Sequence, residues 1–103
     1  MKTIEELVRE LADREAIRDL AVRYCDCLWR DDLEGLLGLF KEDGTFVVEG
    51  QDLDVIQRGR AHLKKMYASL AEKLRPRPFI HNHLIELRGK DRAIGRCYVE
   101  LKT

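Results

Sequence analysis

Residues 79–101 read FIHNHLIELRGKDRAIGRCYVEL, and this stretch decides the fold class. Two runs rich in strand-forming residues, 79–87 and 93–101, flank the turn residues Gly89-Lys90-Asp91, a pattern typical of a β-hairpin. Strands joined by so short a turn run antiparallel. The stretch therefore predicts a long antiparallel hairpin.

Helical periodicity dominates the sequence before residue 45. Thr3 and Glu6 have the spacing of a capping box, which predicts that a helix begins there, and Asp13 is a second cap position that starts a helix over 13–30. Asp31 and Glu34 repeat the box spacing ahead of a short third helix. The apolar stripe of the 13–30 helix recurs at steps of three and four residues: Ile17, Leu20, Ala21, Tyr24 and Leu28.

The period changes at residue 45. Residues 45–49 predict a strand, 50–54 a polar loop and 55–58 a short returning strand. A further helix is predicted over 60–74, and it ends before Arg75-Pro76-Arg77-Pro78 because proline cannot continue a helix. Helices, a strand pair, a helix and a longer strand pair together predict an α+β fold, with antiparallel sheet packed against helices.

Composition restricts the partners. The 103 residues, at 12.0 kDa, predict a single domain over 1–103, and 19 basic residues balance 19 acidic ones. Zero net charge argues against nucleic acid or an anionic membrane surface as a partner. No apolar run is long enough to span a membrane, and the first residues lack a signal-peptide pattern, so we expect a cytoplasmic protein. Cys25, Cys27 and Cys97 are then expected as reduced thiols, with no metal site.

Several segments resemble SnoaL-like domains of the nuclear transport factor 2-like superfamily. The resemblance covers about residues 13–101 and is specific for fold rather than function. The segments that carry it are Ala16–Asp26 (AIRDLAVRYCD), Asp32–Leu36 (DLEGL), Phe40–Phe46 (FKEDGTF), Gly59-Arg60, His81–Leu87 (HNHLIEL) and Gly95–Glu100 (GRCYVE).

The resemblance implies a cone-shaped, strongly bent antiparallel sheet around long helices, with a deep and mostly apolar pocket. It also implies a homodimer built on one face of the sheet. Members commonly add two further long strands, whereas this sequence ends at 101–103. We therefore expect either a C-terminally short member or a sheet that a partner chain completes.

Tyr24 is the first candidate for chemistry. It lies on the apolar stripe of its helix, so its ring is expected to point inward, where its hydroxyl needs a hydrogen-bond partner. Dehydratases of the superfamily use pocket tyrosines to polarise a carbonyl or to hold a water, and the resemblance aligns Tyr24 with such a residue. The alternative is an ordinary core tyrosine bonded to the sheet.

His81, Asn82 and His83 form the second candidate group. In a regular strand His81 and His83 share one face, and Asn82 lies on the other with Ile80 and Leu84. Imidazole suits acid–base catalysis because its pKa lies near neutrality, and related dehydratases keep a histidine early in this strand, paired with a carboxylate. Which histidine faces the pocket stays open, as does a structural or interface role.

Two positions depart from the family pattern. Many relatives have an aspartate where this sequence has Trp29, and the bile-acid type has a carboxylate where this sequence has Leu101. A tyrosine–histidine pair without its carboxylate lacks the anion that orients and charges the imidazole. The pocket is expected to be lined by Trp29, Phe46, Met66, Asn82 and Leu101.

Two functions from different classes follow. The first is a cofactor-free lyase, isomerase or cyclase acting on a small oxygenated ring compound, with Tyr24 donating to the substrate oxygen and His81 or His83 moving a proton. The second is a non-catalytic dimer module that binds a small apolar ligand or a protein. A pocket large enough for a ring compound is needed for catalysis, so cavity volume discriminates between an open and a filled site.

Overall fold

A computed structural model describes residues 1–50 and 54–102. The predicted α+β order is confirmed, and residues 51–53 of the predicted polar loop lie outside the described residues. The helices are α1 (Ile4–Trp29), α2 (Leu33–Leu37) and α3 (Arg60–Lys73). The strands are β1 (Thr45–Val48), β2 (Val55–Arg58), β3 (Arg77–Arg88) and β4 (Arg92–Lys102).

The two helices predicted before residue 30 are in fact one continuous helix, α1. Thr3 caps it as expected, since its hydroxyl accepts the backbone N–H of Glu6 at 3.1 Å. Asp13 is exposed inside the helix and starts no second one. The sequence over 4–29 contains neither glycine nor proline, and an exposed aspartate costs a helix only a few tenths of a kcal/mol, roughly 0.7 at most.

The start of α2 also differs from the prediction, by one residue. Asp32, rather than Asp31, is its cap, and the Asp32 carboxylate accepts the backbone N–H of Gly35 at 3.0 Å. Asp31 instead adopts a positive φ of 54° in the turn that leaves α1. Aspartate is one of the residues that tolerate this conformation, and here it makes the sharp turn between the two helices.

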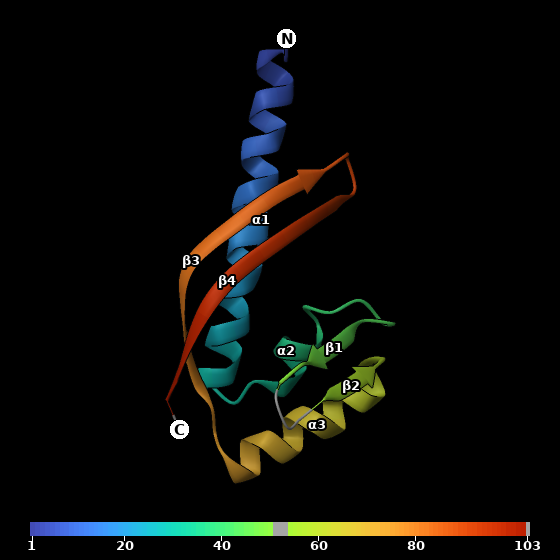
Figure 1. The fold of residues 1–103 in the computed structure, drawn as a ribbon, viewed down its shortest axis with the longest axis vertical. Coiled ribbons are helices and arrows are strands. Elements are labelled where there is room, and N and C mark those ends of the chain that lie inside the picture. The colour runs from blue at the N-terminus through green and yellow to red at the C-terminus, as the bar shows by residue number, and fades with distance from the viewer. Residues whose placement is uncertain (51–53, 103) are drawn as a thin grey trace.

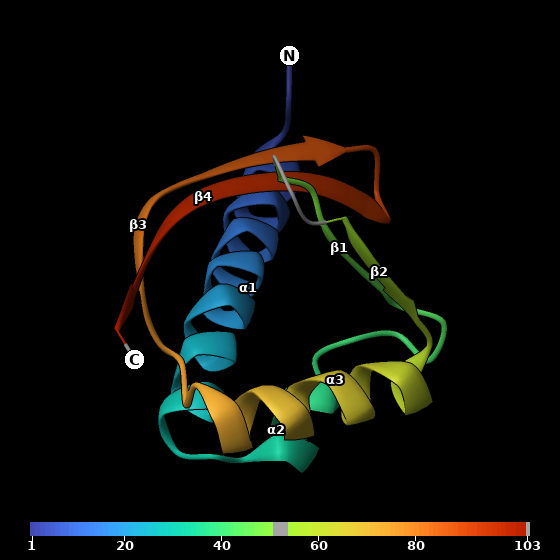
Figure 2. The same cartoon turned by 60° about the horizontal axis from the view of Figure 1, so that its bottom comes forward.

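The described strands form two separate antiparallel pairs, β1 with β2 and β3 with β4. The long β3–β4 hairpin bends across α1, and β3 is the strand that packs against this helix (Figure 1). Turned by 60°, the view shows the hairpin descending on one side of α1 and the β1–β2 pair lying on the other, with α3 running beneath (Figure 2). The elements therefore surround a space on three sides.

Hydrogen bonds fasten β3 to α1 at both ends of the contact. Near the β3–β4 turn, the Arg14 guanidinium donates to the carbonyl of Ile85 at 2.6 Å. At the other end, the indole N–H of Trp29 donates to the carbonyl of Pro78 at 2.9 Å, and the Trp29 ring meets the Phe79 ring edge-on. These contacts fix the long hairpin over the helix, which positions the residues of its inner face.

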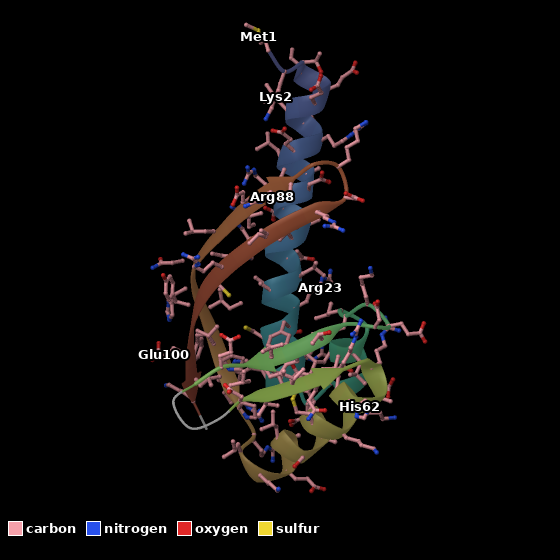
Figure 3. All side chains as sticks on the ribbon, turned by 45° about the vertical axis from the view of Figure 1, so that its right-hand side comes forward. Met1, Lys2, Arg23, His62, Arg88 and Glu100 are labelled. Carbon is pink, nitrogen blue, oxygen red and sulfur yellow. The ribbon has the colours of Figure 1, made fainter. Side chains whose placement is uncertain are left out.

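The hydrophobic core is small and lies between α2 and α3. Its four buried side chains are Leu36, Leu37, Leu63 and Tyr67. Tyr24, Phe40 and Phe46 pack against it from α1, from the segment after α2 and from β1. By contrast, the first turns of α1, with Met1 and Lys2 at their tip, extend beyond the hairpin (Figures 1 and 3). Packing is thus concentrated at one end of the molecule.

Candidate functional site

A cavity of about 860 Å³ occupies the space between α1, β1 and the β3–β4 hairpin. Pockets for small organic ligands measure roughly 300–1,000 Å³, so this volume suits a compound of one to several rings. Tyr24, Phe46 and His83 line the cavity, so the structure brings together three of the predicted site residues. The remaining lining residues are Ile17, Leu20, Ala21, Cys25, Leu39, Phe40, Val47, Pro78, Ile80, Gly95, Cys97 and Val99.

The mouth of the cavity lies between β1 and β4. Val47 of β1 and Val99 of β4 both line the cavity, yet they are 49% and 51% exposed. No hydrogen-bonded ladder joins these two strands within the described part of the chain. A ligand therefore has a route from solvent to the inner wall formed by α1.

A β-bulge at Asn82 determines which histidine enters the cavity. Pairing runs regularly up to His81↔Tyr98 and resumes at Leu84↔Arg96, so two residues of β3 oppose Cys97 alone. Asn82 has a φ of 49°, a conformation that asparagine tolerates better than most residues. The extra residue shifts the in–out alternation of side chains by one position. Even-numbered residues of β3 face the cavity before the bulge, and odd-numbered residues face it after the bulge.

The prediction that His81 and His83 share one face is therefore wrong. Ile80, before the bulge, and His83, after it, line the cavity, whereas His81 faces outward. His81 bonds Glu100 at 3.1 Å, and both side chains are exposed. Glu100 is thus the carboxylate partner of His81, the histidine outside the cavity, and not of His83. Figure 3 shows Glu100 on the outer side of β4.

Gly95 makes room for the His83 ring. A Cβ atom at Gly95 would lie 3.3 Å from Nε2 of His83, closer than most real contacts of a Cβ. The imidazole therefore lies over a strand position that has no side chain. His62, the third histidine, is on α3 and does not line this cavity (Figure 3).

Tyr24 projects from α1 into the cavity and bonds a second tyrosine. Its hydroxyl lies 2.7 Å from the hydroxyl of Tyr67, which is only 3% exposed and belongs to the core. The Tyr24 ring also meets the rings of Phe40 and Tyr67 edge-on. Tyr24 packs against the core and bonds α3 rather than the sheet, and it also lines the cavity.

Either hydroxyl can donate in the tyrosine–tyrosine bond, and neither has another side-chain hydrogen bond among the described residues. When Tyr67 donates, the Tyr24 proton is available to a ligand in the cavity. Burial raises the pKa of both phenols, and the bond from Tyr67 partly offsets the rise at Tyr24. Both hydroxyls are therefore protonated at neutral pH and can donate.

Four predicted lining residues do not line the cavity. Trp29 contacts Pro78 and Phe79 at the C-terminal end of α1. Met66 lies on another side of α3, beside Gln57 and His62. Asn82 is exposed in the bulge, and Leu101 is exposed opposite Pro78 near the end of β4. Met66 does not line the cavity because the apolar stripe of α3 also packs against the core.

The sequence analysis did not assign Tyr67, Cys25 and Cys97 to the site. Tyr67 follows the apolar spacing of α3, at Leu63, Tyr67 and Leu70, and its hydroxyl is the sequence signal that it does more than pack. Cys25 and Cys97 enter the cavity from α1 and β4. No carboxylate is among the described lining residues, and the described chain holds no cluster of three His, Cys, Asp or Glu residues suited to a metal ion.

A long helix crossed by a bent antiparallel hairpin, with an apolar cavity between them, defines an α+β domain of the cystatin-like type. A model of the SnoaL-like domain matches residues 9–103, and the chain belongs to this family, within the nuclear transport factor 2-like superfamily. No curated protein matches the chain significantly. No helix among the described residues has the length and apolarity needed to cross a membrane.

Two solved structures with a similar fold are both described as proteins of unknown function. A protein from Mycobacterium tuberculosis is 30% identical, with a TM-score of 0.79 over 92% of this chain and 53% of its own. The chain thus spans about half the length of that relative. A cystatin-like protein from Nostoc punctiforme PCC 73102 is 22% identical, with a TM-score of 0.69 over 96% of this chain and 67% of its own. This second likeness concerns the fold alone.

Proposed function

We propose that the cavity binds a small, apolar, oxygenated ring compound and catalyses proton transfer next to its carbonyl group without a cofactor. The observation that carries the proposal is the pair formed by Tyr24 and Tyr67. In this proposal Tyr67 donates to Tyr24 across their 2.7 Å bond, which leaves the Tyr24 proton available to an oxygen atom in a cavity of about 860 Å³. A carbonyl oxygen held in this way makes the neighbouring C–H more acidic.

His83 is the group suited to move the proton. It is the basic side chain among the described lining residues, and the bulge at Asn82 directs it inward. An imidazole near neutrality can accept a proton from carbon and return it at another position, which is an isomerisation. Elimination and cyclisation can begin with the same proton transfer, so they belong to the same proposal.

A second candidate function is binding without catalysis. It is favoured by the absence of a carboxylate among the described lining residues, because His83 then lacks an anion to stabilise its charged form. The two candidates differ in one observable. A catalyst accelerates exchange of the acidic C–H of a bound ketone with solvent, whereas a binding module does not.

The test uses tetralone, a ring-fused ketone, in deuterated water. We expect NMR to show reversible binding and faster exchange of the hydrogens beside the carbonyl. Tyr24→Phe should weaken binding about 5- to 15-fold, because the carbonyl loses a hydrogen bond worth about 1–1.5 kcal/mol. His83→Gln should retain binding and slow exchange roughly 100-fold or more.

Tyr67→Phe is the matched control for Tyr24→Phe. It removes the same hydroxyl–hydroxyl bond but keeps the Tyr24 hydroxyl facing the cavity, so tetralone affinity should fall less than in Tyr24→Phe. Equal losses in the two variants would assign Tyr24 a packing role. Binding without any acceleration of exchange would select the non-catalytic function, and no binding would exclude both.

We also propose that the chain forms a homodimer through the outer face of the β3–β4 hairpin. Leu84, Ile94 and Tyr98 are exposed large apolar side chains on this face. These side chains alternate with Arg96 and Glu86 on the same face, a mixture of apolar and charged groups that suits an interface between two copies, and two-fold dimers are the commonest oligomers. His81 lies on the same face, which favours an interface role for it over a catalytic one.

Tyr98→Glu tests the dimer. Sedimentation at micromolar concentration should give about twice 12.0 kDa for the unmodified chain and about 12.0 kDa for the variant, because a buried charge without a partner disfavours association. Lys65→Glu, at an exposed position of α3 rather than of the hairpin, is the control and should remain dimeric. A monomeric unmodified chain would overturn this proposal without affecting the cavity.

A further inference from the structure

Two thiols in the cavity have no part in the proposed proton transfer. Cys25 enters from α1 and Cys97 from β4, and both line the same space as His83 and Tyr24. The third thiol, Cys27, lies outside this cavity in a small crevice between α1, α2 and α3. All three are free and only partly buried. Cys25 and Cys97 are therefore nucleophilic groups on the wall of an apolar cavity.

Cys97 occupies a special position in the hairpin. Because pairing stops at His81↔Tyr98 and resumes at Leu84↔Arg96, Cys97 is the single residue that faces the bulged pair Asn82 and His83. The bulge therefore places the inward-facing residue His83 across from Cys97 on the neighbouring strand, with its imidazole ring lying over the next inner position, Gly95. A cysteine near a histidine is a common arrangement for activating sulfur as a nucleophile.

We propose that the cavity captures cyclic α,β-unsaturated ketones by addition of the Cys97 thiol. The proposal rests on the proposed function, since the ketone must first be held with its oxygen at Tyr24. It narrows the ligand class from oxygenated rings to rings that carry a carbon–carbon double bond conjugated with the carbonyl. Three lining groups, on α1, β3 and β4, then have distinct chemical tasks.

The addition balances without any further reactant. His83 removes the proton from the Cys97 sulfur, and the thiolate forms a bond to the β-carbon of the enone. The π electrons of the carbon–carbon double bond move toward the carbonyl oxygen, where the Tyr24 hydroxyl stabilises the resulting enolate. His83 then returns its proton to the α-carbon. The product is a saturated ketone bound through a thioether, and the reverse steps release the enone.

One adduct per chain is expected, although two thiols line the cavity. Cys97 lies across the hairpin from His83, whereas Cys25 enters from α1, and burial raises the pKa of the Cys25 thiol, which disfavours its thiolate. The thiolate is the form of cysteine that attacks carbon. Cys25 therefore contributes a polarisable wall to the cavity, and Cys97 contributes the nucleophile.

Intact-protein mass spectrometry with cyclohexenone tests the proposal. We expect the full chain to gain the mass of one cyclohexenone, and peptide mapping to place it on Cys97. Cys97→Ser should abolish this adduct, and His83→Gln should slow its formation at least about 10-fold. Cys27→Ser is the matched control, because it removes a thiol outside the cavity, and it should react at the unmodified rate.

Tetralone separates this proposal from the proposed function. It has the carbonyl but no conjugated alkene to accept sulfur, so it reports reversible binding alone. If tetralone binds and competes with cyclohexenone for Cys97, both proposals stand. If tetralone binds but cyclohexenone reacts equally with all three thiols or with none, the thiol addition is overturned and the binding site stands. If tetralone does not bind, the proposed function fails, and a Cys97 adduct that tetralone cannot suppress counts against capture in the cavity.

Discussion

Leu63→Ala is expected to lower the free energy of unfolding by about 2–5 kcal/mol, the usual cost of removing a fully buried leucine side chain. Leu63 is 0% exposed and belongs to a core cluster of four buried side chains among the described residues. So small a core has few neighbours that can close the space left behind. Since domains of this size are typically stable by about 5–15 kcal/mol, one such substitution removes a large share of the total.

Urea denaturation measures this change, and the same helix supplies the control. Leu74 follows the last turn of α3 and is 52% exposed, so Leu74→Ala should change stability by about 0.5 kcal/mol or less. Comparable losses in the two variants would mean that α3 is not held by the core between it and α2. A normal fold and stability in Leu63→Ala would mean that packing lies elsewhere.

Asn82→Val is expected to have the second largest effect, and it acts on both stability and the site. A branched side chain at a φ of 49° costs about 1–3 kcal/mol, because its Cβ atom and the two methyl groups on it crowd the backbone. Valine also favours a regular strand, in which His83 would no longer share the inner face with Ile80. Tetralone exchange and cyclohexenone addition should fall along with stability.

Asn82→Gly separates backbone conformation from side-chain chemistry. Glycine adopts positive φ without strain, so this variant should keep the bulge, the orientation of His83 and the reactivity of Cys97, with stability changed by about 1 kcal/mol or less. A loss of reactivity in Asn82→Gly would assign the Asn82 side chain itself a role in the cavity. Heteronuclear NMR of the His83 ring would report its environment in both variants directly.

The helices and strands could be predicted well from the sequence, because each has a clear hydrophobic periodicity or is bounded by glycine or proline. The hairpin at the end and the helix over 60–74 are bounded by glycine and proline, and both were placed within two residues of their observed ends. The predicted helix start at Asp13 was wrong, because an aspartate has the same sequence signature inside a helix as at a helix N-cap. Only the surrounding chain decides between them, and without glycine or proline the helix continues.

The candidate site was harder to predict, because it depends on one inserted residue. Strict alternation places His81 and His83 together, and the bulge at Asn82 separates them. The local sequence contains only a weak signal for it, an asparagine in a run of strand-forming residues. Tyr24 and Phe46 were placed correctly because a helical stripe and a short strand set their directions locally. Tyr67 needed tertiary contacts to show its bond to Tyr24.

The outer strand of the hairpin also bears on how copies of this chain behave when they are concentrated. Among the described strands β4 pairs only with β3, so its other edge presents unpaired backbone groups, which are a template for fibre growth. The charged residues of this strand are Arg92, Arg96, Glu100 and Lys102. Parallel in-register stacking would place each charge directly on its own copy, about 4.8 Å away. The repulsion between these like charges disfavours amyloid-like growth. Antiparallel pairing, or pairing with a strand of another sequence, does not bring like charges together in this way.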